Sequence, residues 1–419
     1  MLTRIKGTQD ILDLSLYTFL LKKMRERSAI YNFTEISTPI LEKADLFKRT
    51  VGLETDIVTK EMYFVHSGHD EEDMVLRPEI TASTVRAFLN AGIQKTPWKV
   101  FSCGPVFRHE RPQKGRFREF NQLSLETIGS ESPAADVRFI TMIDRFCHEA
   151  LKLDTYALVI NFLGCPQDRI IYKNMLRDFV TKHESALCET CKARKEKNIL
   201  RVLDCKNENC KKIYASAPLL TDHLCNACMN EWSLIKDLLH ELSVSYTHSP
   251  LLVRGLDYYN KIVFEFVDMG TLGSQNAFCA GGRYDTIAGQ LGGKKDYPSI
   301  GCAFGIERLV LMLDAIKDRL PLPQKPALHM VLPLDEKQVG LALQIADDLN
   351  AHRLCSDVML EKSSLKNMLR DAGDAGATTC ILVGSDEQAG GYVTVKNMIA
   401  RTETRVPQNE IREFLQKIA

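Results

Sequence analysis

The densest group of side chains suited to chemistry lies within residues 104–126, GPVFRHERPQKGRFREFNQLSLE. The stretch predicts two strands joined by a charged loop, and alternate residues of a strand share one face. Gln122, Ser124 and Glu126 are therefore expected on one face and the intervening leucines on the other. Planar guanidinium groups bind phosphates through paired hydrogen bonds, so arginines beside carboxylate and amide groups suit a triphosphate held next to a small polar molecule. The same residues suit a solvated hairpin with scattered ion pairs, and their types alone leave both interpretations open.

A second candidate group lies in residues 76–89, LRPEITASTVRAFL, where a strand is predicted to end and a helix to begin. Pro78 makes the residue before it extended. Glu79 and Thr81 then fall at the start of the helix, where free backbone N–H groups favour a carboxylate. These two side chains can cap the helix or bind a ligand, and position alone does not decide between the two roles.

Three later stretches carry further candidates. The run LVRGLDYYNKIVFEF at 252–266 predicts a strand, and CAGGRYD at 279–285 contains paired glycines that let the backbone approach a ligand closely. Tyrosines in such stretches can equally pack in a core. In residues 299–313, SIGCAFGIERLVLML, a strand is predicted to run into an amphipathic helix that begins near Arg308. A cation at a helix start is disfavoured by the helix dipole, and an anionic ligand nearby would offset that cost.

Several of these strings resemble the motifs of the class II aminoacyl-tRNA synthetases. FRHERPQKGRFREF resembles motif 2 in its histidyl form, residues 299–313 resemble motif 3, and Pro39 between a predicted strand and helix resembles motif 1. Residues 252–266 and 279–285 resemble two signatures confined to histidyl-tRNA synthetases and their close relatives. The resemblance spans essentially the whole chain. It implies an enzyme that activates L-histidine with ATP to histidyl-adenylate, releases pyrophosphate, and transfers histidine to the 3′ end of its cognate tRNA.

The resemblance also implies roles for individual side chains. Those at the positions that bind ATP and its Mg²⁺ are Arg108, Glu110, Arg116 and Arg308. Those at the histidine-binding positions are Glu79, Thr81, Gln122, Glu126, Arg254, Tyr258, Tyr259 and Tyr284. Arg254, Arg108 and Arg308 are expected to be the catalytic residues. The residues alone also allow a structural role for Arg254, as the partner of an acid such as Asp257 in an ion pair.

Two other functions fit parts of the pattern. A regulatory subunit of ATP phosphoribosyltransferase resembles the synthetases in its core, but it typically lacks the C-terminal domain and has eroded motifs. A synthetase for another amino acid, such as glycine or proline, would have a related C-terminal domain. Residues 254–259, RGLDYY, argue against that second alternative.

The chain has 419 residues, which is too long for one ordinary core and predicts a multidomain protein of mixed α+β and α/β class. The early stretch predicts a helix at 14–30, a strand at 33–36 and a helix at 41–51. The resemblance implies an antiparallel-sheet catalytic core, formed by residues 1–164 and 249–320 and interrupted by a helical insertion at 165–248. After the proline-rich linker DRLPLPQKPA, strands and helices alternate in a C-terminal α/β domain with a mixed sheet at 327–419. In the family this position holds the anticodon-binding domain.

Six of the thirteen cysteines are bunched at 188–228, within the predicted insertion. Two CxxC pairs can present four thiolates to a structural zinc ion, and Cys188, Cys191, Cys225 and Cys228 are the ligands that this spacing suggests. Cys205 and Cys210 compete for the same places. The alternative is that all six are free thiols packed as small hydrophobic side chains, and the spacing leaves both interpretations open.

Composition limits the partners and the compartment. The chain carries 54 basic and 54 acidic residues, so contact with RNA would rest on local patches and not on a global field. No signal-peptide pattern and no continuous apolar run of membrane-spanning length is present in the sequence. We therefore expect a soluble, cytoplasmic protein with no membrane partner. The resemblance of motif 1 to a symmetric interface element implies a homodimer.

Overall fold

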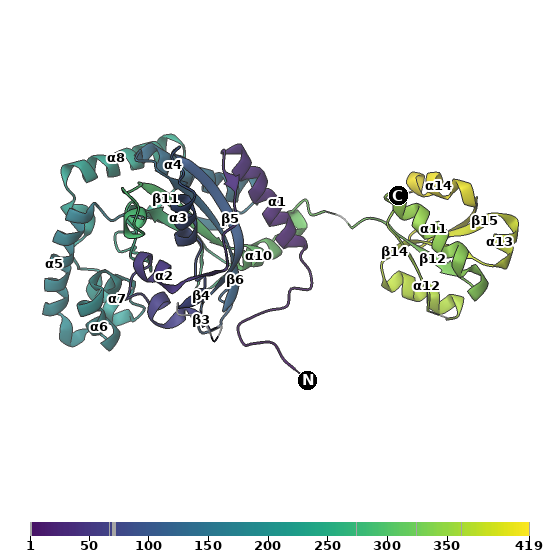
Figure 1. Ribbon diagram of the computed structural model, residues 1–419, viewed down its shortest axis with the longest axis horizontal. Coiled ribbons are helices and arrows are strands. Elements are labelled where there is room, and N and C mark those ends of the chain that lie inside the picture. Colours follow the sequence, from purple (N-terminus) through teal and green to yellow (C-terminus); the bar gives the residue numbers. More distant parts are fainter. Residues whose placement is uncertain are drawn as a thin grey trace. The chain divides into compact units, whose positions relative to one another are not determined.

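The computed structural model describes residues 2–66, 68, 73–273, 275–323, 325–361 and 363–418 (Figure 1). The chain forms two compact units, Met1–Leu322 and Pro323–Ala419. The division falls inside the predicted proline-rich linker, where few residues could continue a helix or a sheet.

An eight-stranded sheet forms the centre of the first unit. Its order is β1 (Thr34–Glu35), β5 (Trp98–Phe107), β6 (Glu119–Ile128), β11 (Ser299–Gly305), β10 (Ala277–Arg283), β9 (Asn260–Asp268), β7 (Tyr156–Phe162) and β8 (Thr247–His248). The six strands from β5 to β7 pair antiparallel, and β1 and β8 pair parallel at the two edges. The predicted antiparallel core is confirmed.

Two hydrophobic clusters cover the two faces of this sheet. One contains α1 (Ser15–Ile30), α4 (Pro133–Arg145) and α10 (Ile306–Asp314), together with the core-facing leucines of β6. The other contains α2 (Ala44–Thr50), α3 (Thr81–Asn90) and α9 (Ile287–Gln290). Adjacent residues Val263 and Phe264 of β9 belong to different clusters, as the alternation of a strand requires. The second cluster lies on the side of the sheet that carries the polar face of β6.

Two local predictions in this unit were wrong. Residues 41–51 are not one helix, because β2 (Leu41–Lys43) pairs with β4 (Met74–Leu76) before α2 begins, and β3 (Tyr63–Val65) completes a small sheet. Residues 252–259 do not join the strand that follows, since β9 begins at Asn260. The Asn161 side chain donates to the carbonyls of Pro250 and Leu252, and this contact holds the segment as a loop.

The predicted insertion is helical. It contains α5 (Pro166–Lys182), α6 (Glu189–Lys197), α7 (Glu208–Tyr214) and α8 (Asn226–Glu241), and α5, α6 and α7 lie together at one side of the unit (Figure 1). Its apolar residues belong to the same hydrophobic cluster as α1, α4 and α10. The ring of Trp232 in α8 stacks on Phe162 of β7, with centroids 5.6 Å apart. The insertion is therefore packed onto the catalytic sheet.

The second unit is a five-stranded mixed sheet with helices. The sheet order is β13 (Ser356–Val358), β12 (Leu328–Pro333), β14 (Ala377–Val383), β15 (Tyr392–Asn397) and β16 (Thr402–Pro407). Its helices are α11 (Val339–Ala351), α12 (Leu365–Asp374), α13 (Ser385–Gly390) and α14 (Ile411–Ile418). The predicted mixed sheet is confirmed. The sequence missed β16 because only Val406 in that edge strand is buried, so no apolar alternation marks it.

Within the described residues, the structure contains no helix with the length and apolar character needed to span a membrane.

Candidate active site

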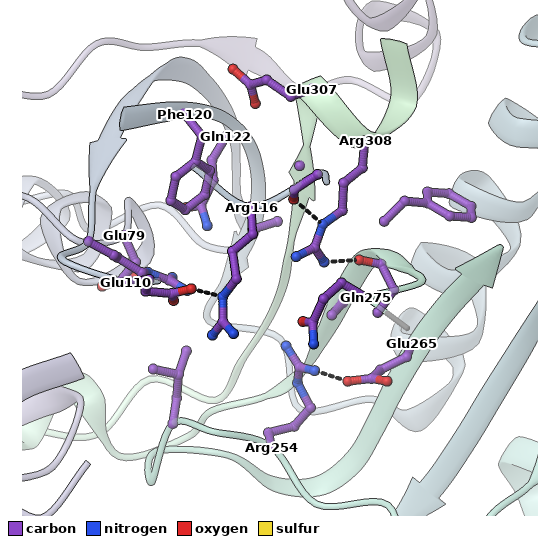
Figure 2. A pocket seen from close by; sticks show the side chains of 18 of the residues that line it. Glu79, Glu110, Arg116, Phe120, Gln122, Arg254, Glu265, Gln275, Glu307 and Arg308 are labelled. Carbon is purple, nitrogen blue, oxygen red and sulfur yellow. Dashed lines mark hydrogen bonds and ion pairs between the residues drawn. The ribbon is translucent and has the colours of Figure 1, made fainter. Parts of the chain in front are cut away.

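A polar cavity of about 300 Å³ opens at the β6, β9, β10 and β11 part of the large sheet. The guanidinium groups of Arg116, Arg254 and Arg308 converge on it from three separate stretches of the chain (Figure 2). All four side chains predicted for ATP line the cavity, as do six of those predicted for histidine. The lining residues among these predictions are Glu79, Thr81, Arg108, Glu110, Arg116, Gln122, Arg254, Tyr258, Tyr259 and Arg308.

On one side of the cavity, arginines are held largely by main-chain carbonyls. Arg308, in the first turn of α10, donates to the carbonyl of Gly115 at 2.9 Å and to that of Ala277 at 2.5 Å. Burial lowers the pKa of Arg308 to about 10, and the nearby Arg116 and Arg108 guanidinium groups add to that effect. A cluster of like charges that disfavours its own protonation is stabilised by an anion, so this side of the cavity favours a polyanionic ligand.

Arg108 and Arg116 complete the cluster. Arg108 donates from Nε to the carbonyl of Pro78 at 2.9 Å, and burial lowers its pKa. Arg116 forms an ion pair with Glu110 across the loop that joins β5 and β6 (Figure 2). Both residues lie in the loop between the two predicted strands, and the loop brings them together.

Arg254 forms an ion pair, and its partner is Glu265 of β9, not Asp257 (Figure 2). Burial lowers the pKa of Arg254, but the Glu265 carboxylate and the rings of Tyr259 and Tyr258 outweigh that and raise it overall. The guanidinium carbon lies 5.7 Å from the centroid of the Tyr259 ring. Asp257 instead accepts a hydrogen bond of 2.6 Å from Asn198 in the insertion. The fixed cation therefore faces the cavity while its counterion lies on the neighbouring strand.

Glu79 caps the helix that follows it. Its two carboxylate oxygens accept hydrogen bonds from the backbone N–H groups of Thr81, at 2.7 Å, and Ala82, at 2.8 Å. Burial raises the pKa of Glu79, and these two N–H groups act against that rise. The capping role is thus present, and the side chain also lines the cavity.

Glu126 lies at the centre of a buried hydroxyl network below the cavity. Its Oε1 accepts from Thr81 Oγ1 at 2.7 Å and from Ser124, and its Oε2 accepts from Tyr284. Burial raises the pKa of Glu126 to about 8 despite these hydrogen bonds. Gly301 pairs with Glu126 across β11 and β6, and a Cβ at that position would collide with the carboxylate. The glycine is therefore what leaves room for Glu126.

Glu126 and Tyr284 are not among the residues that line the cavity, although the sequence places them with the histidine pocket. Both are buried, and Glu126 lies behind Thr81, whose hydroxyl donates to it, while Tyr284 donates to Glu126.

The paired glycines of β10, which were expected to let the backbone approach a ligand, face neighbouring chain segments instead. A Cβ on Gly281 would meet the carbonyl of Gly301, and one on Gly282 would lie 2.9 Å from the Tyr259 ring. The pair makes room for strand and ring packing.

Among the lining residues that sequence reasoning missed are Phe120, Glu265, Gln275 and Glu307. Gln275 lies between Arg254 and Arg308 in Figure 2. Glu307 accepts from the backbone N–H of Asn121 at 2.9 Å, so it joins α10 to β6. The alternation of β9 could have shown Glu265 on the polar face, since it is the only charged residue within IVFEFV.

The predicted set of four zinc ligands was wrong. The thiols of Cys188 and Cys191 cluster with those of Cys205 and Cys210, whereas Cys225 and Cys228 cluster with Cys165 and Asp168. The reason is the chain path, because Cys205 lies between α6 and α7 and Cys210 lies within α7, whereas the second CxxC begins α8, next to the start of α5. Sequence spacing alone favoured the pairing of two like motifs.

Comparison with known proteins agrees with this geometry. A family model described as histidyl-tRNA synthetase matches residues 14–309, and a model described as anticodon binding domain matches residues 329–418. The histidine–tRNA ligase of Nitratidesulfovibrio vulgaris is 41% identical over 402 residues, which cover 95% of this chain and 94% of that protein. The histidine–tRNA ligase of Halothermothrix orenii is 39% identical over 419 residues, which cover 99% and 98%.

Among solved structures, the apo histidyl-tRNA synthetase of S. aureus matches with a TM-score of 0.81 and 28% identity, and the match covers 99% of each chain. The antiparallel sheet, the arginine-lined cavity and the C-terminal domain together define a class II aminoacyl-tRNA synthetase. Within that class, the family model that matches residues 14–309 and the relatives that match nearly the full chain indicate the same family. The chain belongs to the histidyl-tRNA synthetase family.

Proposed function

We propose that this cavity joins ATP and L-histidine to form histidyl-adenylate and pyrophosphate, and that the histidyl group then passes to the terminal ribose of its cognate tRNA. The chemistry requires two anions to meet, since the histidine carboxylate attacks the α-phosphate. Such a reaction depends on positioning and on charge neutralisation more than on covalent assistance. The single observation that carries the proposal is the convergence of three guanidinium groups on one cavity that has a carboxylate-centred network beneath it.

In this proposal Arg108, Arg116 and Arg308 bind the phosphates of ATP. Arg116 exchanges its ion pair with Glu110 for the triphosphate, which frees the Glu110 carboxylate to approach the Mg²⁺ that ATP brings with it. Aminoacyl-tRNA synthetases in general use ATP with Mg²⁺, so the metal enters as part of the substrate complex. The lowered pKa of Arg308 supports this assignment, because burial and the neighbouring arginines disfavour its charge and a bound polyanion would offset both effects.

We assign the histidine substrate to the side of Glu79, Thr81 and Gln122. Glu79 and Thr81 would bind the amino group and Gln122 the carboxylate. Glu126 and Tyr259 would meet the imidazole, whose neutral form offers one donor and one acceptor. Tyr258 and Tyr284 would pack beside the ring. Because Glu126 lies beneath Thr81, contact with the ring requires Thr81 to release its hydrogen bond to that carboxylate.

Arg254 would lie where the two substrates meet. A planar guanidinium can donate to the histidine carboxylate and to the α-phosphate at once, which offsets their repulsion before the reaction and holds the charge that shifts during attack. Its ion pair with Glu265 supports this role by fixing the side chain before substrate arrives. Arg254, Arg108 and Arg308 are thus the residues that we propose to be catalytic.

The experiment that tests the proposal is ATP–pyrophosphate exchange by the purified protein with each amino acid in turn. Exchange that depends on histidine alone is expected. Exchange with glycine or proline, or no exchange with any amino acid, would contradict the proposed substrate or the proposed reaction.

We further propose that the chain acts as a homodimer. The small sheet of β2, β3 and β4 follows the motif that resembles an interface element, and Leu41 and Phe64 on it are 49% and 44% exposed. A symmetric contact would bury both copies of such apolar side chains. Sedimentation at micromolar concentration is expected to give about twice the chain mass of 47.4 kDa. A fully active monomer would overturn this proposal.

A further inference from the structure

Four thiols in the insertion lie close together at a distance that suits a metal and not a disulfide. The Sγ atoms of Cys188, Cys191, Cys205 and Cys210 all lie within 4.8 Å of one another, and those of Cys188 and Cys205 are 3.7 Å apart. A disulfide bond is about 2.0 Å long. Zinc bound by thiolates at about 2.3 Å in a tetrahedron separates its sulfur atoms by about 3.8 Å. The observed spacing is close to that of a tetrahedral four-thiolate site.

The backbone around these thiols also favours negative charge on sulfur. The N–H of Cys188 donates to the Sγ of Cys210 at 3.3 Å, and the N–H of Asn207 donates to the Sγ of Cys205 at 3.4 Å. Hydrogen bonds from backbone N–H groups stabilise thiolates and orient them as ligands. In the sequence a lysine directly follows each of Cys191, Cys205 and Cys210. Four thiolates around one Zn²⁺ carry a net charge of about −2, and these lysines place positive charge nearby in the chain, although Lys192 and Lys211 also form ion pairs with Glu189 and Glu208.

The two short helices that carry the thiols have little apolar surface to hold them in place. Cys191 is the only residue of α6 that is buried, and Cys210 and Tyr214 are the only buried residues of α7. Short helices are stabilised mainly by burying an apolar face. If the cysteines were packed only as small hydrophobic side chains, α6 would rest on a single thiol, whereas a bound metal would join both helices at one point.

We infer that Cys188, Cys191, Cys205 and Cys210 bind one zinc ion through four thiolates, in a closed structural site separate from the active-site cavity. A site with four protein ligands leaves no open position for a substrate, so this zinc supports the fold and takes no part in the reaction. This inference does not depend on the proposed function, because metal content is measured independently of activity.

The second cluster has a different explanation. In it, Asp168 accepts the backbone N–H of Cys165 at 3.2 Å with one oxygen and that of Cys225 at 3.0 Å with the other. The carboxylate therefore joins the start of α5 to the start of α8 through these two hydrogen bonds. Cys225 is exposed, and Cys228 is buried. This cluster provides a matched control, because a buried cysteine can be replaced there without touching the four-thiolate site.

The test is metal analysis of the full-length protein, purified under reducing conditions without chelator, and of two single variants. The wild-type protein is expected to contain zinc. Cys205→Ser is expected to lose one zinc per chain, whereas Cys228→Ser is expected to retain it. The inference is overturned if the wild-type protein holds no zinc and takes none up when incubated with it. It is also overturned if Cys228→Ser loses the metal and Cys205→Ser keeps it.

A second measurement keeps the test decisive if Cys205→Ser does not fold. X-ray absorption at the zinc edge of the wild-type protein reports the ligand atoms directly. A shell of four sulfur atoms is expected for the inferred site. Three sulfur atoms and one oxygen would assign the metal to the cluster of Cys165, Asp168, Cys225 and Cys228 and would overturn the inference.

Discussion

The two sides of the cavity balance their charges in opposite ways. On the arginine side, Arg108 and Arg308 donate to main-chain carbonyls, and burial together with the neighbouring Arg116 and Arg108 guanidinium groups lowers the pKa of Arg308. Beneath the cavity, in a layer that we call the floor, Glu126 accepts from the hydroxyl groups of Thr81, Ser124 and Tyr284, and burial raises its pKa. The first side is short of negative charge, and the second holds an acid in surroundings that disfavour its ionisation. Each side is therefore complementary to one substrate and unsuited to the other.

The two sides also differ in how the chain builds them. The arginine side brings together a loop, a helix start and the end of a strand, so its geometry depends on contacts between segments far apart in sequence. The floor lies on adjacent strands whose register fixes Glu126 against Gly301. In the proposed function Arg254 lies between the two sides, and the predictions below test whether the two sides can be changed separately.

The largest effect is expected at the junction. Arg254→Lys replaces a planar group that can bond both substrates with a point charge on a flexible stem. Loss of one preorganised donor costs about 10²- to 10³-fold in rate, so histidine-dependent pyrophosphate exchange should fall by that factor. Transfer from preformed adenylate should fall less, because the carboxylate attack is already complete. Arg319→Lys, an exposed pair with Asp154 outside the cavity, is the matched control.

Near-wild-type exchange by Arg254→Lys would refute the junction role. A loss of activity matched by an equal loss of folded protein would show instead that the ion pair with Glu265 is structural.

The next effect should be confined to the floor. Glu126→Gln keeps an acceptor oxygen but cannot ionise, so above about pH 8, where Glu126 carries its charge, histidine should bind about 10- to 100-fold more weakly, as expected for a lost hydrogen bond to a charged group. The KM for ATP should change little. In the wild-type protein, histidine affinity should rise as pH increases through about 8, where Glu126 ionises, and the variant should lack that rise. Glu119→Gln, exposed on the same strand, is the control.

An unchanged affinity of Glu126→Gln for histidine would show that this residue does not contact the imidazole. A matching loss of ATP affinity would show that the two sides of the cavity are not separable.

A smaller effect concerns stability. The pKa of Glu126 is about 8 in the folded protein against an ordinary value of 4.5, so between these values the folded chain retains a proton that the unfolded chain releases. The contribution of this group to stability is complete below about pH 4.5 and is lost as pH rises through about 8. Its slope is at most about 1.4 kcal/mol per pH unit. Unfolding midpoints measured across this window should fall less steeply for Glu126→Gln than for the wild-type protein. Parallel curves would contradict the raised pKa.

Local patterns in the sequence predicted a large part of this architecture. The alternation of β6 placed Gln122, Ser124 and Glu126 on the polar face and the leucines in the core, because period two is a property of the strand itself. The start of α10 near Arg308 followed from its amphipathic pattern. The string resemblances located the other predicted residues that line the cavity, since each string lies within one short segment.

Pairings between distant segments could not be predicted in the same way. Asp257 is close to Arg254 in sequence, yet the loop turns its carboxylate to Asn198, and Glu265 on β9 takes the arginine. The cysteine groups were misassigned for the same reason, because helix packing decides which thiols meet. Glu126 fits behind Thr81 because Gly301 on β11 leaves room for its carboxylate, and no pattern within β6 reveals that glycine.

The smallest effect is expected from outside the cavity. Asn198 donates to Asp257 at 2.6 Å, and Arg169 of α5 donates to the carbonyl of Tyr259 at 2.9 Å, so the insertion holds both ends of the segment that carries Tyr258. Asn198→Ala removes one of these contacts. The KM for histidine should rise about 2- to 10-fold, which corresponds to the net value of a single hydrogen bond, and the KM for ATP should stay the same. Asn230→Ala, an exposed asparagine of α8, should change neither. Equal changes for both substrates would mean that the insertion supports the whole cavity, and no change would mean that the segment holds its shape without this contact.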